Sequence, residues 1–190
     1  MLTDKLTSDK GKPIFNKKVT FFFIKLFLLF SVWFVSYALL LQPGRKIDRP
    51  LTNFLTSSVT KGINFFSSEQ VGWIENPSRP CTHLTKNGQP IFDIFDVCNG
   101  IDLMFIYVGV LFLLPYPLKR KIVYSICGMA AIIILNIIRI CSLYFIYVYQ
   151  RKAFDFSHHY LFTLLMYVLI FYGWWLFVKK SRTYDQIKTT

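Results

Sequence analysis

Residues 122–149 read IVYSICGMAAIIILNIIRICSLYFIYVY, and this stretch decides the fold. It is long and apolar enough to cross a bilayer, which takes about 20 residues of helix. Its single charged residue is Arg139. A charged side chain inside an apolar helix is costly, so it marks a candidate functional site. The stretch therefore predicts a membrane protein whose chemistry involves Arg139.

Further apolar segments accompany this one. The chain has 190 residues, of which 54% are hydrophobic, and we expect a single domain over residues 1–190. The first apolar segment is long for a signal peptide and contains Lys25, which favours an uncleaved helix. The expected fold class is an all-α integral membrane protein. It has about four transmembrane helices, at about residues 19–41, 101–118, 122–149 and 160–178.

The basic residues cluster at the ends of the apolar segments. The formal net charge is +12, and the clusters lie in the N-terminal head, in the turn at 119–121 and in the tail at 179–182. Basic clusters flank the cytoplasmic ends of transmembrane helices. We therefore expect both termini in the cytoplasm and the loops 42–97 and 150–158 outside. The same distribution argues against nucleic acid as a partner.

The long outer loop, residues 42–97, has its own predicted organisation. Within residues 51–66, apolar side chains recur at helical spacing, which predicts an amphipathic helix on the membrane surface. Lys86-Asn87-Gly88-Gln89 is typical of a hairpin turn. The second arm of this short β-hairpin, residues 91–96, leads directly into Cys98. Such a hairpin would aim the thiol and offer an edge to an extended peptide.

Three reactive side-chain types are expected at the outer face of the membrane. Cys98 opens the second helix, and His158 and His159 open the last. Arg139 lies 18 residues after Lys121. This separation is about 27 Å along a helix, close to the hydrocarbon thickness of about 30 Å. A thiol, a guanidinium and an imidazole at one depth suggest a membrane-embedded cysteine enzyme.

The chemistry suits a nucleophilic thiol. A neighbouring cation favours the thiolate of Cys98, and Asn99-Gly100 predicts a turn that exposes the first backbone N–H groups of a helix. Arg139 stays protonated, so it can hold a thiolate or stabilise an oxyanion. Asn136 stands one turn earlier on the same helix face and could orient Arg139.

The two histidines are consecutive, so they point about 100° apart on a helix. At most one of them is expected to face the cysteine as acid or base, because imidazole titrates near neutral pH. Simpler interpretations stay open for each residue. Cys98 could pack or form a disulfide with Cys81, Arg139 could reach lipid headgroups, and both histidines could be interfacial.

The remaining cysteines give weaker signals. Cys127 and Cys141 fall inside one apolar segment and are expected to be inert packing residues. Cys81-Thr82-His83 is a single weak pair with no second half, so it does not predict a zinc site. We expect neither a metal nor a cofactor.

Three motifs together resemble those of the exosortase/archaeosortase family. They are Val97-Cys98-Asn99-Gly100-Ile101, Asn136-Ile137-Ile138-Arg139-Ile140 and His158-His159 opening a final aromatic-rich helix. The short chain, the Cys-Asn-Gly variant and the doubled histidine resemble the compact F-type members of Bacteroidota. Larger members carry more helices and often Cys-Ser-Gly, so Asn99 is a departure that puts the substrate rules in doubt.

The resemblance implies a membrane-embedded cysteine protease or transpeptidase. Such enzymes cut C-terminal sorting signals of exported proteins, made of a short motif, a transmembrane helix and a basic tail. Cys98 would form an acyl-thioester, Arg139 would stabilise charge, and His159 would assist proton transfer. His159 is preferred over His158 because the family's histidine is followed four positions on by a small residue, here Thr163.

The resemblance also implies a multi-pass protein of the bacterial inner membrane with its active site at the periplasmic face. Its partners would be membrane lipids and the exported substrates. Two other functions remain open. One is a non-enzymatic membrane scaffold or assembly factor whose Arg139 and His159 bind lipid phosphate. The other is a thiol–disulfide protein that uses Cys81 and Cys98.

Overall fold

The structure, a computed structural model, describes residues 17–41, 44–67 and 70–188. Most of these residues are helical, and one small sheet interrupts the helices. The long helices are α1 (Lys17–Ser36, continued by the π-helical turn Tyr37–Leu41), α2 (Asp48–Phe66), α3 (Ile101–Leu113), α4 (Leu118–Tyr149) and α6 (Phe162–Lys188). Short turns join α4 to α6: a 3-10 turn (Arg151–Ala153), α5 (Phe154–Phe156) and a π-helical turn (Ser157–Leu161).

Three helical runs are long and apolar enough to cross a membrane within the described residues. They are Val19–Leu39, Leu118–Tyr149 and Arg151–Ser181. The predicted helix at 101–118 ends at Leu113, because Pro115 and Pro117 cannot donate helical hydrogen bonds. Its 13 residues extend only about 20 Å, which is less than the bilayer core. The expected four full spans are therefore three spans and one short apolar helix.

The boundaries of the other predicted helices shift for local reasons. α4 begins at Leu118 rather than 122, because Pro117 supplies an extended residue that starts the helix. The basic residues 119–121 consequently form its first turn instead of a loop. The last helical run begins near Arg151, so both histidines lie inside it rather than before it.

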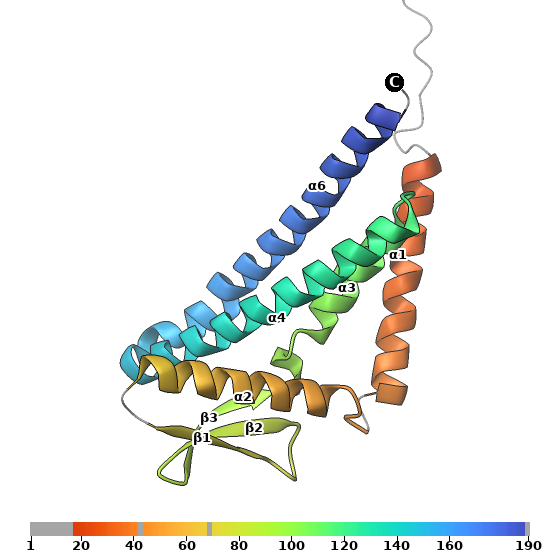
Figure 1. Cartoon of the computed structure of the whole chain (residues 1–190). Helices are drawn as coiled ribbons and strands as arrows, with labels where there is room; N and C mark the ends of the chain where they lie inside the picture. The colour runs from red at the N-terminus through yellow and green to blue at the C-terminus, as the bar shows by residue number, and fades with distance from the viewer. Residues whose placement is uncertain (1–16, 42–43, 68–69, 189–190) are drawn as a thin grey trace, which may run out of the picture.

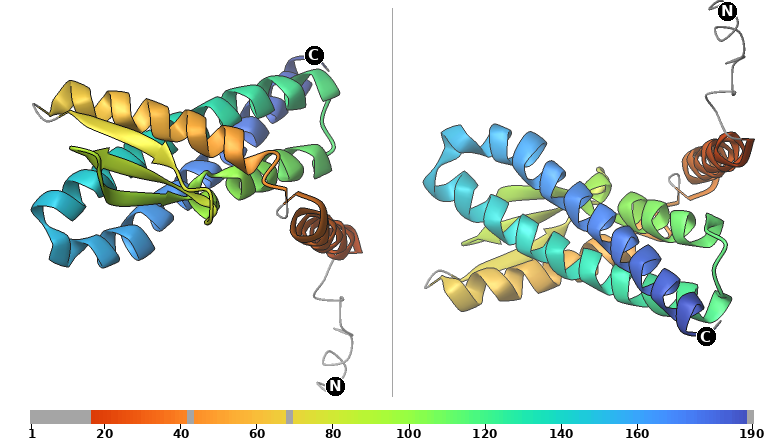
Figure 2. Two further views of the ribbon diagram at one scale, coloured as in Figure 1. Left: turned by 90° about the horizontal axis from the view of Figure 1, so that it is seen from below. Right: turned by 90° about the horizontal axis from the view of Figure 1, so that it is seen from above.

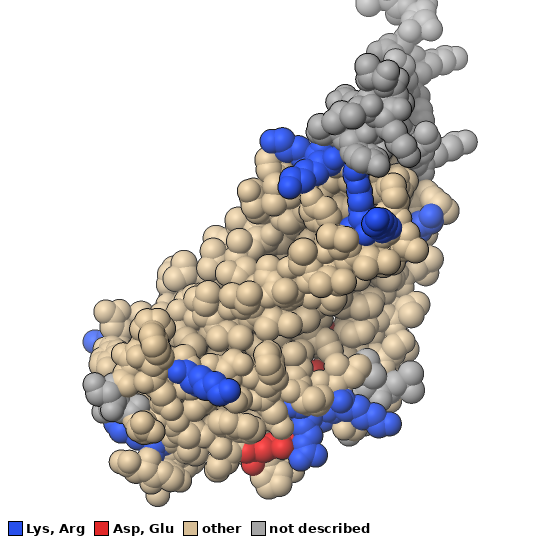
Figure 3. All heavy atoms as spheres, viewed as in Figure 1, with Lys and Arg blue, Asp and Glu red and all other residues tan. Residues whose placement is uncertain are grey.

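The helices and the sheet separate into two layers. α1, α3, α4 and α6 run together, and α2 with the sheet crosses one end of them (Figure 1). We call the end of the helices that α2 and the sheet cross the sheet end. At the opposite, basic end, α1 and α4 begin and α6 finishes, and Lys and Arg side chains gather there in Figure 3. Both further views in Figure 2 keep the sheet beside α2.

The expected hairpin is confirmed, but it belongs to a larger sheet. β2 (Cys81–Lys86) and β3 (Gln89–Phe95) pair antiparallel around Asn87 and Gly88, which both have positive φ, as a tight hairpin turn requires. β1 (Val71–Glu75) pairs with the other edge of β2. The all-α expectation is therefore incomplete, because the chain also contains a three-stranded sheet. β1 supplies the third strand, and a two-stranded hairpin alone would be only marginally stable.

α2 holds the sheet against the membrane helices. Its buried stripe carries Leu55, Val59 and Ile63, which are fully enclosed, whereas Phe54 and Phe66 are exposed. The predicted helix is thus present, and its buried face packs on protein. Its position on the membrane surface stays a prediction. One core cluster joins α2, the sheet and α4, from Val59, Ile63, Val71, Leu84, Ile94, Ile140 and Tyr144. A second joins α3, α4 and α6, from Tyr107, Leu111, Ile132, Met166, Ile170 and Phe177.

Candidate active site

Cys98 lies in a tight turn between the sheet and α3. After β3 the chain forms a 3-10 turn over Asp96–Cys98, and α3 starts at Ile101. Gly100 has φ 82°, which a residue with a Cβ adopts only with strain. A Cβ there would also stand 3.4 Å from the Asn136 side-chain nitrogen. The glycine therefore lets the chain turn sharply and approach α4 closely.

Asn99 ties this turn to the start of α2. Its side chain is fully buried, and Oδ1 accepts the Ile101 backbone N–H at 2.9 Å. Its Nδ2 donates to Asp48 Oδ1 at 2.8 Å, while the Tyr37 hydroxyl donates to the other Asp48 oxygen at 3.0 Å. Buried polar groups are costly unless they are paired, so this chain of contacts stabilises one conformation of the Cys98 turn.

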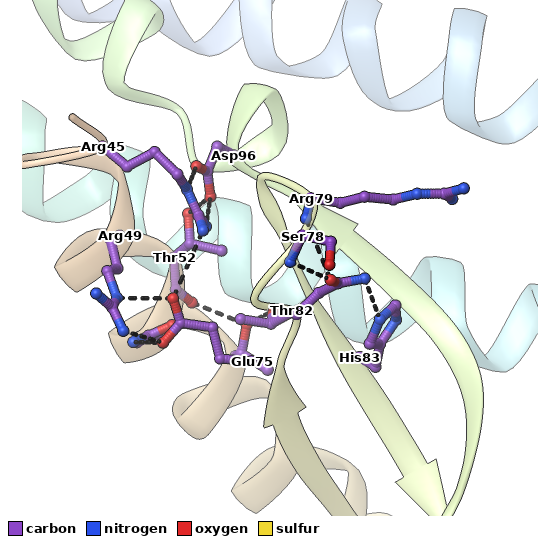
Figure 4. A network of polar contacts seen from close by, with 12 residues as sticks. Arg45, Arg49, Thr52, Glu75, Ser78, Arg79, Thr82, His83 and Asp96 are labelled. Carbon is purple, nitrogen blue, oxygen red and sulfur yellow. Dashed lines mark hydrogen bonds and ion pairs between the residues drawn. The ribbon is translucent and has the colours of Figure 1, made fainter. Parts of the chain in front are cut away.

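Asp96 fixes the other side of the turn. Its carboxylate accepts two hydrogen bonds from Arg45, at 2.6 and 3.0 Å, and one from the Thr52 hydroxyl at 2.8 Å (Figure 4). Its backbone carbonyl accepts the Asn99 N–H at 3.0 Å. The hydrogen bond to Asp96 raises the pKa of Arg45. A bidentate pair of this kind is geometrically specific, so it fixes where β3 ends.

Asn136 joins the cysteine turn to Arg139. Its Nδ2 donates to the Cys98 backbone carbonyl at 2.8 Å, and its Oδ1 accepts from Arg139 Nη1 at 3.3 Å. Asn136 is fully buried and Arg139 is half-buried. The Arg139 Nε is buried and has no hydrogen-bond partner among the described residues. Asn136 therefore stands between the guanidinium and the Cys98 turn, and Cys98 is itself half-buried.

The two histidines occupy different environments in their π-helical turn. His158 is half-buried, stacks on Phe154 with ring centroids 5.7 Å apart, and lies close enough to Arg139 to experience its charge. His159 is exposed and meets the His158 ring edge-on at 4.8 Å. Among the described residues, no hydrogen bond links the Cys98 thiol to either ring. The expected role of His159 stays a prediction, and His158 is the more buried of the two rings.

The other cysteines are not part of this turn. Cys127 is exposed on α4, and Cys141 is half-buried with its Sγ 3.7 Å from the Val59 carbonyl oxygen. Cys81 is buried at the start of β2. Cys81 and Cys98 are both free thiols in the structure.

Sequence reasoning missed the carboxylates that hold the turn. Asp48 and Asp96 are each 51 residues from a partner, Asn99 and Arg45 respectively. No local pattern connects residues at that separation. The one available signal was an acidic residue directly before the Val97-Cys98 pair.

The comparisons with known proteins agree with the motif pattern. The family model for transmembrane exosortases matches residues 18–179, which is most of the chain. Searches of curated proteins and of solved structures found no match.

Proposed function

The chain belongs to the transmembrane exosortase family, and on that premise we propose that it is a membrane-embedded cysteine protease or transpeptidase. It cleaves C-terminal sorting signals of exported proteins through an acyl-enzyme on Cys98. The observation that carries this proposal is the link Cys98–Asn136–Arg139, in which one buried amide contacts both the Cys98 backbone carbonyl and the Arg139 guanidinium.

Catalysis begins with the Cys98 thiolate. The thiolate attacks the scissile carbonyl carbon, a C–S bond forms, and the carbonyl oxygen becomes an oxyanion. The N-terminus of α3 begins just after Cys98, and a helix N-terminus favours negative charge. Collapse of the intermediate breaks the peptide C–N bond, and the departing amine takes up a proton. A nucleophile, water or an amine, then attacks the thioester and restores the thiol.

Arg139 stabilises the oxyanion in this scheme. Its partnered Nη1 fixes the orientation of the guanidinium, and its unpartnered Nε remains to donate. A preorganised donor accelerates the step because it meets the charge without reorganisation. His159 accepts and donates the proton in this scheme. His158 is the alternative residue for this role, because it is half-buried near Arg139.

The proposed substrates carry a short C-terminal motif, a transmembrane helix and a basic tail. Such a helix would lie in the bilayer beside the protein, with its motif at the sheet end near Cys98. The basic end then faces the cytoplasm by the positive-inside rule. With this orientation, we propose that the active site lies at the periplasmic face of a bacterial inner membrane, with lipids as the other partners.

A non-enzymatic function is the main alternative. The unpartnered Arg139 Nε would also suit a lipid phosphate, so the chain could act as a scaffold or assembly factor. A thiol–disulfide function has less support. Cys81 is fully enclosed, and its burial raises the pKa of the thiol, which lowers its reactivity.

Arg139→Lys separates the enzyme from the scaffold. Lysine keeps the charge and the attraction to phosphate but loses the planar fork of donors. If Arg139 stabilises an oxyanion, we expect turnover to fall about 10²–10³-fold. The measurement is cleavage of a co-expressed exported protein bearing such a signal, per unit of membrane-inserted enzyme. Near-normal turnover with unchanged protein level would instead favour the lipid-binding role.

A further inference from the structure

A second cluster of reactive side chains lies on the sheet, separate from the Cys98 turn. Cys81 and His83 are two residues apart on β2, so they project from the same face of the strand. Asp93 on β3 is paired directly with His83. The thiol, one imidazole nitrogen and one carboxylate oxygen all lie within 4.8 Å of one another.

Strand pairing creates this cluster, and spacing along the chain does not reveal it. Cys81 and His83 alone form half of a metal-ligand pattern. Asp93 supplies a third ligand because the turn at Asn87 and Gly88, together with a register shift between Leu84 and Thr85, places it opposite His83.

The His83 ring is held in one orientation. Its Nδ1 lies 2.6 Å from Asp93 Oδ1, and its Nε2 lies 2.8 Å from Asn76 Nδ2. The Asn76 Oδ1 also accepts the backbone N–H groups of Ser78 and Arg79. Figure 4 shows His83 beside this turn. Asn76 Nδ2 can only donate, so Nε2 accepts and Nδ1 carries the proton toward Asp93.

Cys81 lies under the same turn. Its backbone N–H donates to the Arg79 carbonyl, and its carbonyl accepts from Asn76. Its side chain is fully enclosed, and its sulfur has no hydrogen bond among the described residues. A buried thiol beside an imidazole–carboxylate pair is an arrangement in which a cation can replace protons.

We propose that Cys81, His83 and Asp93 form a binding site for a zinc-class divalent metal. A thiolate and an imidazole favour zinc over magnesium or calcium, and three protein ligands leave a fourth position for water. Binding releases the thiol proton to solvent. Nδ1 takes the cation in place of its hydrogen bond to Asp93, its proton moves to Nε2, and the Asn76 amide turns so that its oxygen accepts from Nε2. Asp93 is exposed, and Asn76 lies at the start of the loop between β1 and β2, so either partner has room to turn.

The metal would clip β2 to β3 at the end of the hairpin nearest Cys98. Cys81 pairs with Phe95, the last residue of β3, and Asp96 follows directly. A bound cation would therefore stabilise the strand that delivers the cysteine turn. The site does not depend on the proposed peptidase activity, because none of its ligands belongs to the Cys98–Asn136–Arg139 link.

The test uses full-length protein purified in detergent and stripped with a chelator. Zn²⁺ is titrated in competition with a chromophoric chelator, and Co²⁺ is added separately to report thiolate ligation by its charge-transfer absorption. We expect one metal per chain, a thiolate–cobalt band, and a zinc-dependent rise in Tm. Asp93→Asn changes an exposed side chain, and loss of a direct ligand should weaken zinc binding at least about 100-fold. Cys81→Ser should remove the cobalt band.

Matched controls separate the site from other thiols. Cys98→Ala and Cys127→Ala should bind zinc like the wild type. Absence of stoichiometric zinc binding to the wild type would overturn the proposal and leave the cluster as a hydrogen-bond network only. Zinc binding that survives both Asp93→Asn and Cys81→Ser would place the metal elsewhere and overturn it too.

Discussion

At the scale of residues, two buried asparagines carry the geometry of the candidate site. Asn99 and Asn136 are both fully enclosed, and both side-chain ends of each are hydrogen-bonded. An amide can donate and accept at once, which lets one side chain satisfy a backbone group and a charged group together. Asn99 departs from the Cys-Ser-Gly of larger relatives, and a serine is too short to connect both Ile101 and Asp48.

The histidines differ enough to be separated by substitution. If His159 transfers the proton, His159→Gln should lower turnover about 10²–10⁴-fold and His158→Gln should have a smaller effect. The reverse order would assign the proton transfer to His158, which is half-buried. The measurement is cleavage of the same co-expressed substrate by both variants at equal membrane levels. If both variants cleave normally, neither imidazole takes part in proton transfer.

At this scale the reactive side chains could be predicted from the sequence, but the residues that hold them in position could not. Cys98, Arg139 and Asn136 stand out because polar and charged residues are rare in apolar helices. The partners Asp48 and Asp96 come from a loop in which such residues are ordinary. Their importance arises only from folding, which buries them beside the turn.

At the scale of elements, α2 and the sheet act as one support for the Cys98 turn. The segment before α2 supplies Arg45, the helix supplies Thr52, and both reach Asp96 at the end of β3. Arg49 belongs to the same helix but pairs with Glu75 on β1, at 2.7 Å. Arg45 therefore contacts both carboxylates, Asp96 at 2.6 Å and Glu75 at 3.5 Å, whereas Arg49 contacts Glu75 on the far strand.

These two arginines allow a matched test of the support. Arg45 is 20% exposed and Asp96 8%, so Arg45→Met leaves a buried carboxylate without its cation and should cost about 3–5 kcal/mol. Arg49 is 61% exposed, and Arg49→Met should cost at most about 1 kcal/mol. Thermal unfolding in detergent measures both. Equal effects of the two variants would mean that the Arg45–Asp96 pair has no special role.

Element boundaries were harder to predict than element types. The amphipathic helix, the hairpin and the long apolar helices were foreseeable from periodicity and turn residues. β1 was not, because its five residues follow a helix directly and gain stability only by pairing with β2. The short length of α3 follows from Pro115 and Pro117, whereas apolarity alone suggested a longer span.

At the scale of the whole molecule, charge and architecture point to one orientation. The basic end carries Lys119, Lys121, Lys179 and Lys180 around the start of α4 and the end of α6. The sheet end carries the candidate site. Positive residues flank cytoplasmic ends, so the sheet end should face the periplasm.

Reporter fusions test this orientation. A fusion after Lys121 and one at the C-terminus should report the cytoplasm, and an insertion at Asn87 should report the periplasm. The turn at Asn87 and Gly88 is suitable because both residues are exposed. A periplasmic signal from either of the first two fusions would contradict this orientation, because Cys98 would then lie on the opposite side of the membrane from exported proteins.

The central claim is that Cys98 forms an acyl-enzyme, and the most direct measurement is to isolate that species. Membranes containing the protein and a sorting-signal substrate are quenched in acid, and the Cys98 peptide is analysed by mass spectrometry. The account predicts a hydroxylamine-sensitive thioester to the upstream part of the substrate. The adduct and the cleavage should both disappear in Cys98→Ala and persist in Cys127→Ala and Cys141→Ala. Continued cleavage by the Cys98→Ala protein would contradict the account.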